Sequence, residues 1–279
     1  MGEARFKVLR KWFKGKKVKE AQPPLPHEPS LNDKMLRYIE QNQHRQPGPR
    51  EGVLRPEILI PCYNHGAFIG NLVDVLQDVN VPVTVIDDNS NAETREIIDN
   101  LQRKHGLKVI RNAVNLRQAG SLNKAIAESE NNLFIVANAD DYLLPAWVSY
   151  ALGKFGETDI SLLGGKHICF FNHFPQSEKH MAQTLRQSNY QPQSGFRMHG
   201  PDDARHFSHD NSIDMTMTGC TFLKSAWEFV GGFYNLENRV SIHDDRDFQM
   251  RVCAFFKIGV SDELSAFWRS DSSTGMGTK

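Results

Sequence analysis

The sequence predicts an α/β fold with a mixed, mostly parallel sheet flanked by helices. From Glu57 onward, short apolar segments alternate with segments of helical length, and the order begins and ends with a strand. The short segments are nearly all apolar, as expected of parallel strands covered on both faces. In such a sheet, ligands bind beyond the carboxyl ends of the strands. We therefore expect the functional residues in the loops that follow the strands.

The expected elements follow one another along the chain. Residues 1–56 form a basic, proline-rich arm, with a helix candidate at 31–43. The strand candidates are 58–61, 83–87, 108–111 and 133–138, and the helix candidates between them are 68–79, 93–104 and 118–129. Each helix candidate carries apolar residues at spacings of three and four. Residues 57–145 are expected to form a Rossmann-like half, and residues 146–279 a second half with an irregular insertion at about 166–210.

Composition limits the classes of partner and compartment. The formal net charge is zero, which argues against nucleic acid as the main partner. The four cysteines form no C-x-x-C pair, so we expect neither a disulfide framework nor a zinc site, and a reducing cytosol. No run approaches the roughly 20 apolar residues that span a bilayer, and no signal peptide is recognisable. We expect a cytoplasmic protein that can also attach to a membrane from the side.

The N-terminal arm contains a basic amphipathic segment at residues 5–19. It carries lysines and arginines without any acid, and its aromatic and leucine residues recur at helical spacing. Such a segment can lie on an anionic membrane surface. The alternative is a solvated, disordered basic tail.

Polar residues cluster after the predicted strands. Tyr63 and Asn64 follow the first strand, Asp87-Asp88 follows the second, and Asp140-Asp141 follows the fourth. A single such pair is commonly a turn or a helix cap, but two pairs on one sheet edge favour a polar cleft. Carboxylates after the fourth strand suit Mn²⁺ or Mg²⁺, which would bridge a diphosphate. Carboxylates after the second strand would accept hydrogen bonds from a base or a ribose.

Four segments together resemble family-two glycosyltransferases, which use nucleotide-diphospho-sugars and have the GT-A fold. They are I-P-C-Y-N-H at 60–65, V-I-D-D-N-S-N-A-E-T at 85–94, N-L-R-Q-A-G-S-L-N-K-A-I at 115–126 and A-N-A-D-D at 137–141. The resemblance implies a nucleotide-binding half and an acceptor half. It implies that the nucleotide-sugar contacts Pro61, Tyr63, Asn64, Asp87, Asp88, Arg117, Asn123 and Asp140. An alternative for Arg117 is a solvated loop arginine.

The same resemblance implies metal ligands. Asp140 and Asp141 would bind Mn²⁺ or Mg²⁺ with the diphosphate. Near the C-terminus, F-W-R-S-D-S-S at 267–273 resembles the family's Tyr-Arg-x-His-x-x-Ser segment, with Asp271 where histidine is common. Asp271 is therefore expected either as an additional ligand or as an ordinary loop residue.

The second half carries the expected catalytic carboxylate. H-D-D-R-D-F-Q-M-R at 243–251 resembles the family's Glu-Asp-x-Asp-x-x-x-Arg motif, with Asp244 in the glutamate position. Asp245 is the expected base, which takes the proton of the acceptor hydroxyl as its oxygen attacks the sugar. Direct displacement of this kind inverts the anomeric configuration. The alternative is an acidic helix N-terminus that is favoured by the helix dipole.

The function expected from these motifs is transfer of a sugar from a nucleotide-sugar donor, with UDP favoured, to a glycan or lipid-linked saccharide acceptor. A bacterial-type enzyme of surface polysaccharide synthesis fits this expectation. Two alternatives remain: a catalytically silent sugar- or nucleotide-binding scaffold of the same fold and, less favoured, a nucleotidyltransferase. The sequence lacks the glycine-rich phosphate loop of nucleotidyltransferases and the G-x-G-x-x-G motif of dinucleotide-binding oxidoreductases.

Overall fold

The computed structural model describes residues 29–50, 52–170, 195–207, 213, 215–241 and 243–269. The chain divides into two compact units, residues 1–30 and 31–279, and the structure below is that of the second. The basic segment at 5–19 and Asp271 lie outside the described residues. Within the described ranges, no helix has the length and apolar character needed to cross a bilayer.

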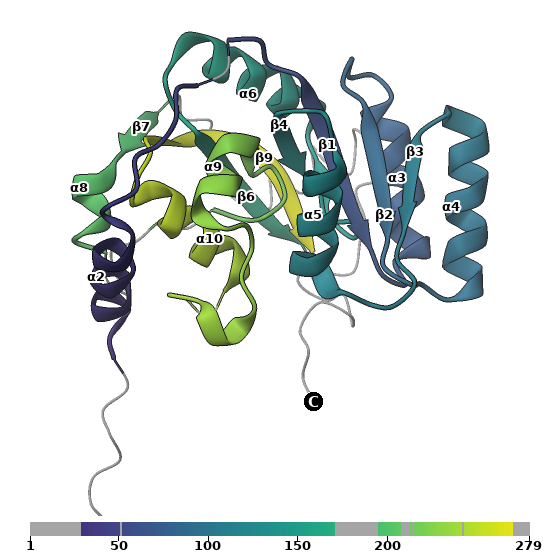
Figure 1. Ribbon diagram of the computed structural model, residues 1–279. Helices are drawn as coiled ribbons and strands as arrows, with labels where there is room; N and C mark the ends of the chain where they lie inside the picture. Colours follow the sequence, from purple (N-terminus) through teal and green to yellow (C-terminus); the bar gives the residue numbers. More distant parts are fainter. Residues whose placement is uncertain are drawn as a thin grey trace, which may run out of the picture. The chain divides into compact units, whose positions relative to one another are not determined.

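A single mixed sheet runs through the unit, and the predicted α/β class is confirmed (Figure 1). The described strands lie in the order β3-β2-β1-β4-β8-β6-β9-β5, and β7 also pairs with β9. The first four along the chain are parallel: β1 (Pro56–Cys62), β2 (Val83–Asp87), β3 (Lys108–Arg111) and β4 (Leu133–Val136). All four predicted strands are therefore present, each within two residues of the expected bounds.

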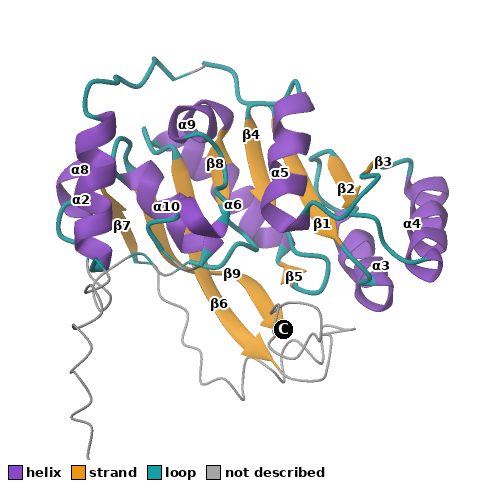
Figure 2. Cartoon of the chain, turned by 60° about the horizontal axis from the view of Figure 1, so that its bottom comes forward, coloured by secondary structure: helices purple, strands orange, loops and turns teal. Residues whose placement is uncertain are grey.

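The second half continues the same sheet. The short strand β8 (Thr221–Leu223) pairs antiparallel with both β4 and β6 (Leu162–Phe170). β9 (Ile258–Arg269) runs parallel to β6, and the two lie side by side in Figure 2. β5 (Tyr142–Leu143) and β7 (Phe196–His199) pair antiparallel with β9. The parallel, nucleotide-type half and the second half thus share one hydrogen-bonded sheet.

Helices lie on both sides of this sheet (Figures 1 and 2). The crossover helices are α3 (Gly66–Leu76), α4 (Ala92–His105) and α5 (Arg117–Glu128). Asn91 caps α4 by accepting a hydrogen bond from the Thr94 backbone N–H, and Gly106 ends it with a φ of 67°. The second half adds α6 (Pro145–Glu157), α8 (Pro201–Ala204), α9 (Lys224–Val230), a 3₁₀ turn at Leu236–Asn238 and α10 (Asp244–Cys253).

The compact unit begins at Leu31, earlier than the boundary expected at residue 57. Helix α2 (Leu31–Asn42) packs beside α10 and buries Met35, Tyr38 and Ile39. The Tyr38 ring meets the Phe255 ring edge to face, with 6.0 Å between centroids. Because this apolar face is covered, α2 belongs to the folded unit and not to the arm.

Glu57 joins the amino ends of the parallel strands. Its buried carboxylate accepts hydrogen bonds from Thr84, Ser129 and Asn131. Burial raises the pKa of Glu57, but these hydrogen bonds outweigh burial and hold the pKa below its ordinary value. The carboxylate is therefore a structural link at the sheet edge opposite the expected site.

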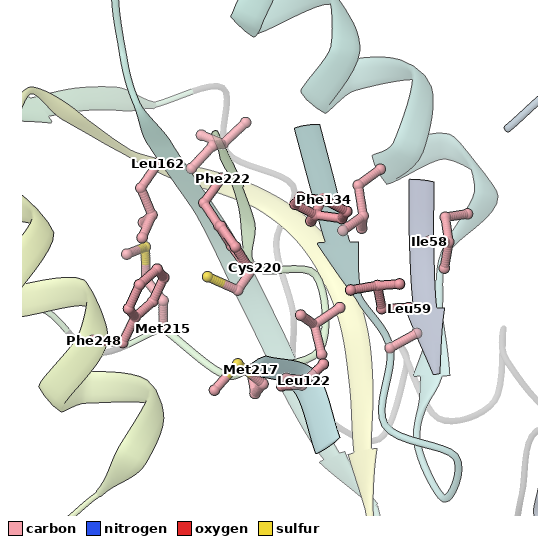
Figure 3. Close-up of a cluster of buried hydrophobic side chains, with 14 of the residues drawn as sticks. Ile58, Leu59, Leu122, Phe134, Leu162, Met215, Met217, Cys220, Phe222 and Phe248 are labelled. Carbon is pink, nitrogen blue, oxygen red and sulfur yellow. The ribbon is translucent and has the colours of Figure 1, made fainter. Parts of the chain in front are cut away.

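One apolar core extends through both halves (Figure 3). Leu59 and Phe134 come from the parallel strands, and Phe222 lies next to them on β8. The Phe222 ring meets the Phe248 ring of α10 edge to face, with 4.9 Å between centroids. Aromatic pairs of this geometry add to the stabilisation from burial. The position of α10 is thereby tied to the centre of the sheet.

Candidate functional site

The carboxyl ends of β1, β2 and β4 bring the predicted polar residues together. Cys62 at the end of β1 is in register with Asp87 of β2. Burial raises the pKa of the Cys62 thiol to about 12, and the nearby charges of Asp87 and Asp140 act in the same direction. The charges of two predicted carboxylates, one at the end of the second strand and one after the fourth, thus act on the thiol at the end of the first. The polar residues that follow these strands therefore lie at the carboxyl edge of the parallel strands, as expected from the sequence.

The loop after β1 presents an aromatic ring. Pro61 is buried within the strand, whereas the Tyr63 side chain is exposed. Asn64 has a φ of 59°, a conformation that few residues other than glycine and asparagine adopt readily. Its side-chain oxygen accepts a hydrogen bond from the Asn91 backbone N–H (2.8 Å), and its own N–H donates to Ser90 Oγ (3.1 Å). Asn64 therefore shapes the loop that exposes Tyr63.

Asp87 and Asp88 are both buried but face different partners. Asp87 Oδ1 accepts a hydrogen bond from the Ser90 N–H (2.9 Å), and its Oδ2 lies 3.6 Å from a terminal nitrogen of Arg111. Asp88 Oδ1 accepts from Asn112 Nδ2 (2.9 Å) and from the Leu116 N–H (2.7 Å). Asp88 thus holds the loop between β3 and α5 against the end of β2.

Asp140 and Asp141 have distinct environments. The two carboxylate oxygens of Asp141 accept hydrogen bonds from Thr218 Oγ1 (2.5 Å), Asn138 Nδ2 (3.2 Å) and the Arg269 N–H (3.0 Å). Burial, reinforced by the charge of Asp140, raises the pKa of Asp141 to about 7. The Asp140 carboxylate instead lies 3.9 Å from His65 Nε2. Asp141 fastens the loop to the segment before β8 and to the end of β9, and Asp140 is directed toward the loop after β1.

Sequence reasoning missed two residues at this edge, His65 and Arg269. Arg269 is buried at the end of β9, where its Nε donates to the Asp140 carbonyl oxygen (3.1 Å). Burial lowers the pKa of His65, and the charge of Arg269 adds to that effect while Asp140 opposes it. Both residues fall inside the quoted motifs, so the signal was present but their role was not assigned.

Asp245 stands in the first turn of α10, in the second half. Burial raises the pKa of the Cys220 thiol to about 12, and the second cause is the charge of Asp245. The Cys220 carbonyl oxygen accepts a hydrogen bond from the N–H of Val136, the last residue of β4. The charge of Asp245 therefore acts on a residue that is hydrogen-bonded to the end of the strand that leads to Asp140. Asp244 precedes Asp245 in the first turn of α10, and its Oδ2 lies 3.8 Å from Nη2 of Arg239.

Below this turn, Asp247 and Arg251 form a fully buried ion pair. Arg251 donates to Asp247 Oδ2 from Nε (2.9 Å) and from Nη2 (2.8 Å). It also donates to the carbonyl oxygens of Val230 and Gly232 (both 2.8 Å). Asp247 Oδ1 accepts from the Val240 N–H (2.7 Å). The pair connects α10 to the end of α9 and to the turn at Gly231 and Gly232 that follows α9.

Asn123 and Arg117, both expected to contact the nucleotide, differ in position. Asn123 Nδ2 donates to the Phe233 carbonyl oxygen (2.8 Å), and its Oδ1 accepts from Trp227 Nε1 (3.0 Å) and the Phe233 N–H (2.9 Å). Its amide thus joins α5 to the turn at Gly231 and Gly232, and its contact with the nucleotide-sugar stays a prediction. Arg117 is exposed at the start of α5 with a φ of 61°.

The carboxylates after β4 suit a metal that substrate phosphates also help to hold. Among the described residues, no group of three or more His, Cys, Asp or Glu side chains is arranged to hold an ion. Mg²⁺ and similar hard ions are commonly bound by one or two carboxylates together with substrate phosphates. Asp140 fits that chemistry, and Asp141, whose oxygens also accept hydrogen bonds from the protein, stays a predicted ligand.

A family model described as glycosyl transferase family 2 matches residues 57–225, more than half of the chain. The chain belongs to this family. It is a glycosyltransferase, and the predicted family and activity class are confirmed. The match includes Asp140 and Asp141 but ends before Asp244 and Asp245. None of the curated proteins matches the chain in sequence.

Solved glycosyltransferase structures share the fold of this family member. A mannosyltransferase from Pyrobaculum calidifontis, in complex with GDP-Man and Mn²⁺, has a TM-score of 0.55 at 13% identity, covering 88% of this chain and 67% of its own. S. aureus TarS 1-349, in complex with UDP-GlcNAc, has a TM-score of 0.59 at 18% identity, covering 81% of this chain and 61% of its own. At these identities the likeness shows the GT-A fold alone.

Proposed function

We propose that this chain transfers a sugar from a UDP-sugar to a hydroxyl group of a saccharide or lipid-linked saccharide, with inversion and with the help of a divalent metal. The observation that carries the proposal is the placement of two carboxylates from different halves. Asp140 lies in the loop after β4, and the charge of Asp245, at the first turn of α10, acts on Cys220, whose carbonyl oxygen is hydrogen-bonded to the last residue of β4. One carboxylate can serve the leaving diphosphate and the other the attacking hydroxyl.

The donor nucleoside would bind across the ends of β1 and β2. The exposed Tyr63 ring offers a stacking surface, and the Asp87 carboxylate accepts hydrogen bonds at the same edge. Asp88 supports the loop that carries Arg117. Solved neighbours were bound to UDP, UDP-GlcNAc and GDP-Man, which supports a nucleoside diphosphate sugar and leaves UDP as part of the proposal.

Mn²⁺ or Mg²⁺ would be held by Asp140 and the donor diphosphate, and it would supply positive charge for the departing nucleotide. The Mn²⁺ in the mannosyltransferase complex supports a metal of this kind. Asp141, also predicted as a ligand, accepts hydrogen bonds from Thr218 and the Arg269 N–H, so it would in addition position Asp140. Asp271, expected as a further ligand, lies outside the described residues and remains a prediction.

Asp245 would act as the base. A carboxylate at the first turn of α10 can accept the acceptor proton while the hydroxyl oxygen attacks the anomeric carbon from the face opposite the diphosphate. A single displacement leaves the product with the inverted configuration. The buried Asp247–Arg251 pair holds the helix on which Asp245 stands.

The test uses the purified chain with a panel of UDP- and GDP-sugars, with and without Mn²⁺. Donor consumption and the anomeric configuration of the product are followed by NMR. Asp245→Asn should lower turnover by roughly 10²- to 10⁴-fold while nucleotide binding is kept. Asp202→Asn, at an exposed position on α8, is the matched control.

Three outcomes would count against parts of the proposal. Unchanged turnover in Asp245→Asn would refute the base assignment. A product with retained configuration would refute direct displacement. Nucleotide binding with neither transfer to any tested acceptor nor hydrolysis of the donor would favour the silent scaffold.

The membrane contact of residues 5–19 also remains a proposal. Residues in this segment are basic and aromatic, which suits an anionic bilayer surface. Flotation with anionic liposomes compares the whole chain with a chain lacking residues 1–20. Equal flotation of both would refute the proposal.

A further inference from the structure

We propose that Tyr38 of helix α2 is a positioning residue for the base: it acts through Arg251 to hold the first turn of α10, and with it Asp245, in place. This inference rests on the proposed function and deepens it, because it gives the reaction a residue from outside the matched family region. The family model begins at residue 57, after the end of α2. Neither the sequence motifs nor that match assigns a role to this helix.

Tyr38 is buried where α2 packs against α10. Its ring meets the Phe255 ring edge to face, and its ring centroid lies 6.0 Å from the guanidinium carbon of Arg251. Burial raises the pKa of Tyr38 to about 12, and the charge of Arg251 acts in the opposite direction. Tyr38 is thus a contact between α2 and the buried ion pair of α10.

The chain of contacts continues from Arg251 to the first turn of α10. Arg251 donates to Asp247 from two nitrogens (2.9 Å and 2.8 Å), and both side chains are fully buried. Asp247 Oδ1 accepts from the Val240 N–H (2.7 Å), and the Asp247 N–H donates to the His243 carbonyl oxygen (2.9 Å). Asp245 precedes Asp247 by two residues in the same turn. A shift of Arg251 would therefore move the backbone on which Asp245 stands.

Helix α2 is itself held near both ends. Close to its start, Asn32 Nδ2 donates to two backbone carbonyl oxygens just after α8 (3.0 Å and 3.1 Å), and α2 lies beside α8 in Figures 1 and 2. Just after its end, the guanidinium carbon of Arg45 lies 4.4 Å from the centroid of the Phe229 ring of α9. Because the helix is held at two points, the Tyr38 ring between them has a defined place.

Burial of an apolar face is the simpler explanation of α2. Met35 and Ile39 serve that purpose, since both are almost completely buried. Tyr38 differs from them because its ring lies near a desolvated guanidinium, to which aromatic rings are attracted electrostatically. A displacement of a catalytic group by about 1 Å can lower a rate by on the order of 10²-fold. The loss of the Tyr38 ring should therefore change turnover as well as stability.

The experiment separates positioning from stability. Tyr38→Ala removes the ring, whereas Tyr38→Phe keeps it. Three quantities are measured below the melting temperature: turnover per folded molecule with the donor and acceptor that the panel identifies, binding of UDP and GDP with Mn²⁺ by calorimetry, and hydrogen exchange of α10 by mass spectrometry. We expect Tyr38→Ala to lower turnover roughly tenfold to a hundredfold and to speed exchange at residues 244–251, with nucleotide binding unchanged. Tyr38→Phe should match the wild type in all three.

Leu101→Ala, at a buried position on α4, is the control for lost stability. It should lower the melting temperature and leave turnover per folded molecule unchanged. Equal losses of turnover in Leu101→Ala and Tyr38→Ala would overturn the inference. Unchanged turnover per folded molecule in Tyr38→Ala would also overturn it, because Tyr38 would then be structural only. A loss of turnover that is matched by an equal loss of nucleotide binding has the same meaning, because the effect would not be specific to the base.

Failure of the proposed function gives a different result. A wild-type chain without turnover, or unchanged turnover in Asp245→Asn, refutes the proposed function or its base, and the role of Tyr38 falls with it. If Tyr38→Ala does not fold, Tyr38→Leu keeps an apolar side chain on α2 without the ring. This variant is judged by the same three measurements.

Discussion

Replacing Arg251 with methionine should strongly destabilise the chain. Arg251 and Asp247 are fully buried, and Arg251 also donates to the carbonyl oxygens of Val230 and Gly232. Removing one partner of a buried ion pair leaves the other charge uncompensated, which costs about 3–5 kcal/mol. For a chain of this size, each kcal/mol lowers the melting temperature by about 2–4 °C, so the expected drop is roughly 6–20 °C.

A double variant tests whether the charge of Asp247 is the cause. Arg251→Met combined with Asp247→Leu removes both charges, and loss of both is far less costly than loss of one. Recovery should be partial, because the N–H of Val240 and two carbonyl oxygens still lose their partners. Urea unfolding followed by circular dichroism gives both free energies. The reasoning is refuted if the single variant costs under about 1 kcal/mol, or if the double variant is no more stable than the single.

Two further predictions concern stability. Gly232 has a φ of 75°, and an added Cβ would lie 2.7 Å from Asn123 Oδ1, whereas Gly106 has a φ of 67° and open space around it. Gly232→Ala should therefore cost more than Gly106→Ala, which should cost only about 1 kcal/mol, and equal thermal shifts would contradict the contact with Asn123. Because the pKa of Glu57 is held below its ordinary value of 4.5, its stabilisation is present above pH 4.5 and lost as pH falls below it. Glu57→Gln should flatten that acid decline in unfolding free energy, and an unchanged pH profile would refute the assignment.

The parallel half could be predicted because its signals are local. Each of the first four strands is a short apolar segment followed at once by polar residues, and the parallel order puts those residues on one edge. The positions of Asp87 and Asp140 follow from that pattern alone. The caps of α4 are likewise written in adjacent residues, Asn91 and Gly106.

The remaining features depend on contacts between distant residues. Arg269 donates to Asp141 across a separation of 128 residues, and no periodicity predicts that partner. β9 contains Asp262 and Glu263 in its middle, so its polar pattern hides a buried strand. Motifs name residue types, and only the fold shows that Asn123 and Asp141 also hold protein partners. Their contacts with ligands stay predictions.

The antiparallel strand β8 also limits how the molecule can move. It is hydrogen-bonded on one side to β4 and on the other to β6, so the two halves are parts of one continuous sheet. Separating the two halves as rigid bodies would break the backbone hydrogen bonds of β8 and expose the shared core. The free-energy cost of this is too large for thermal motion to supply. Opening of a hinge between the two halves is therefore not expected to accompany substrate entry or product release.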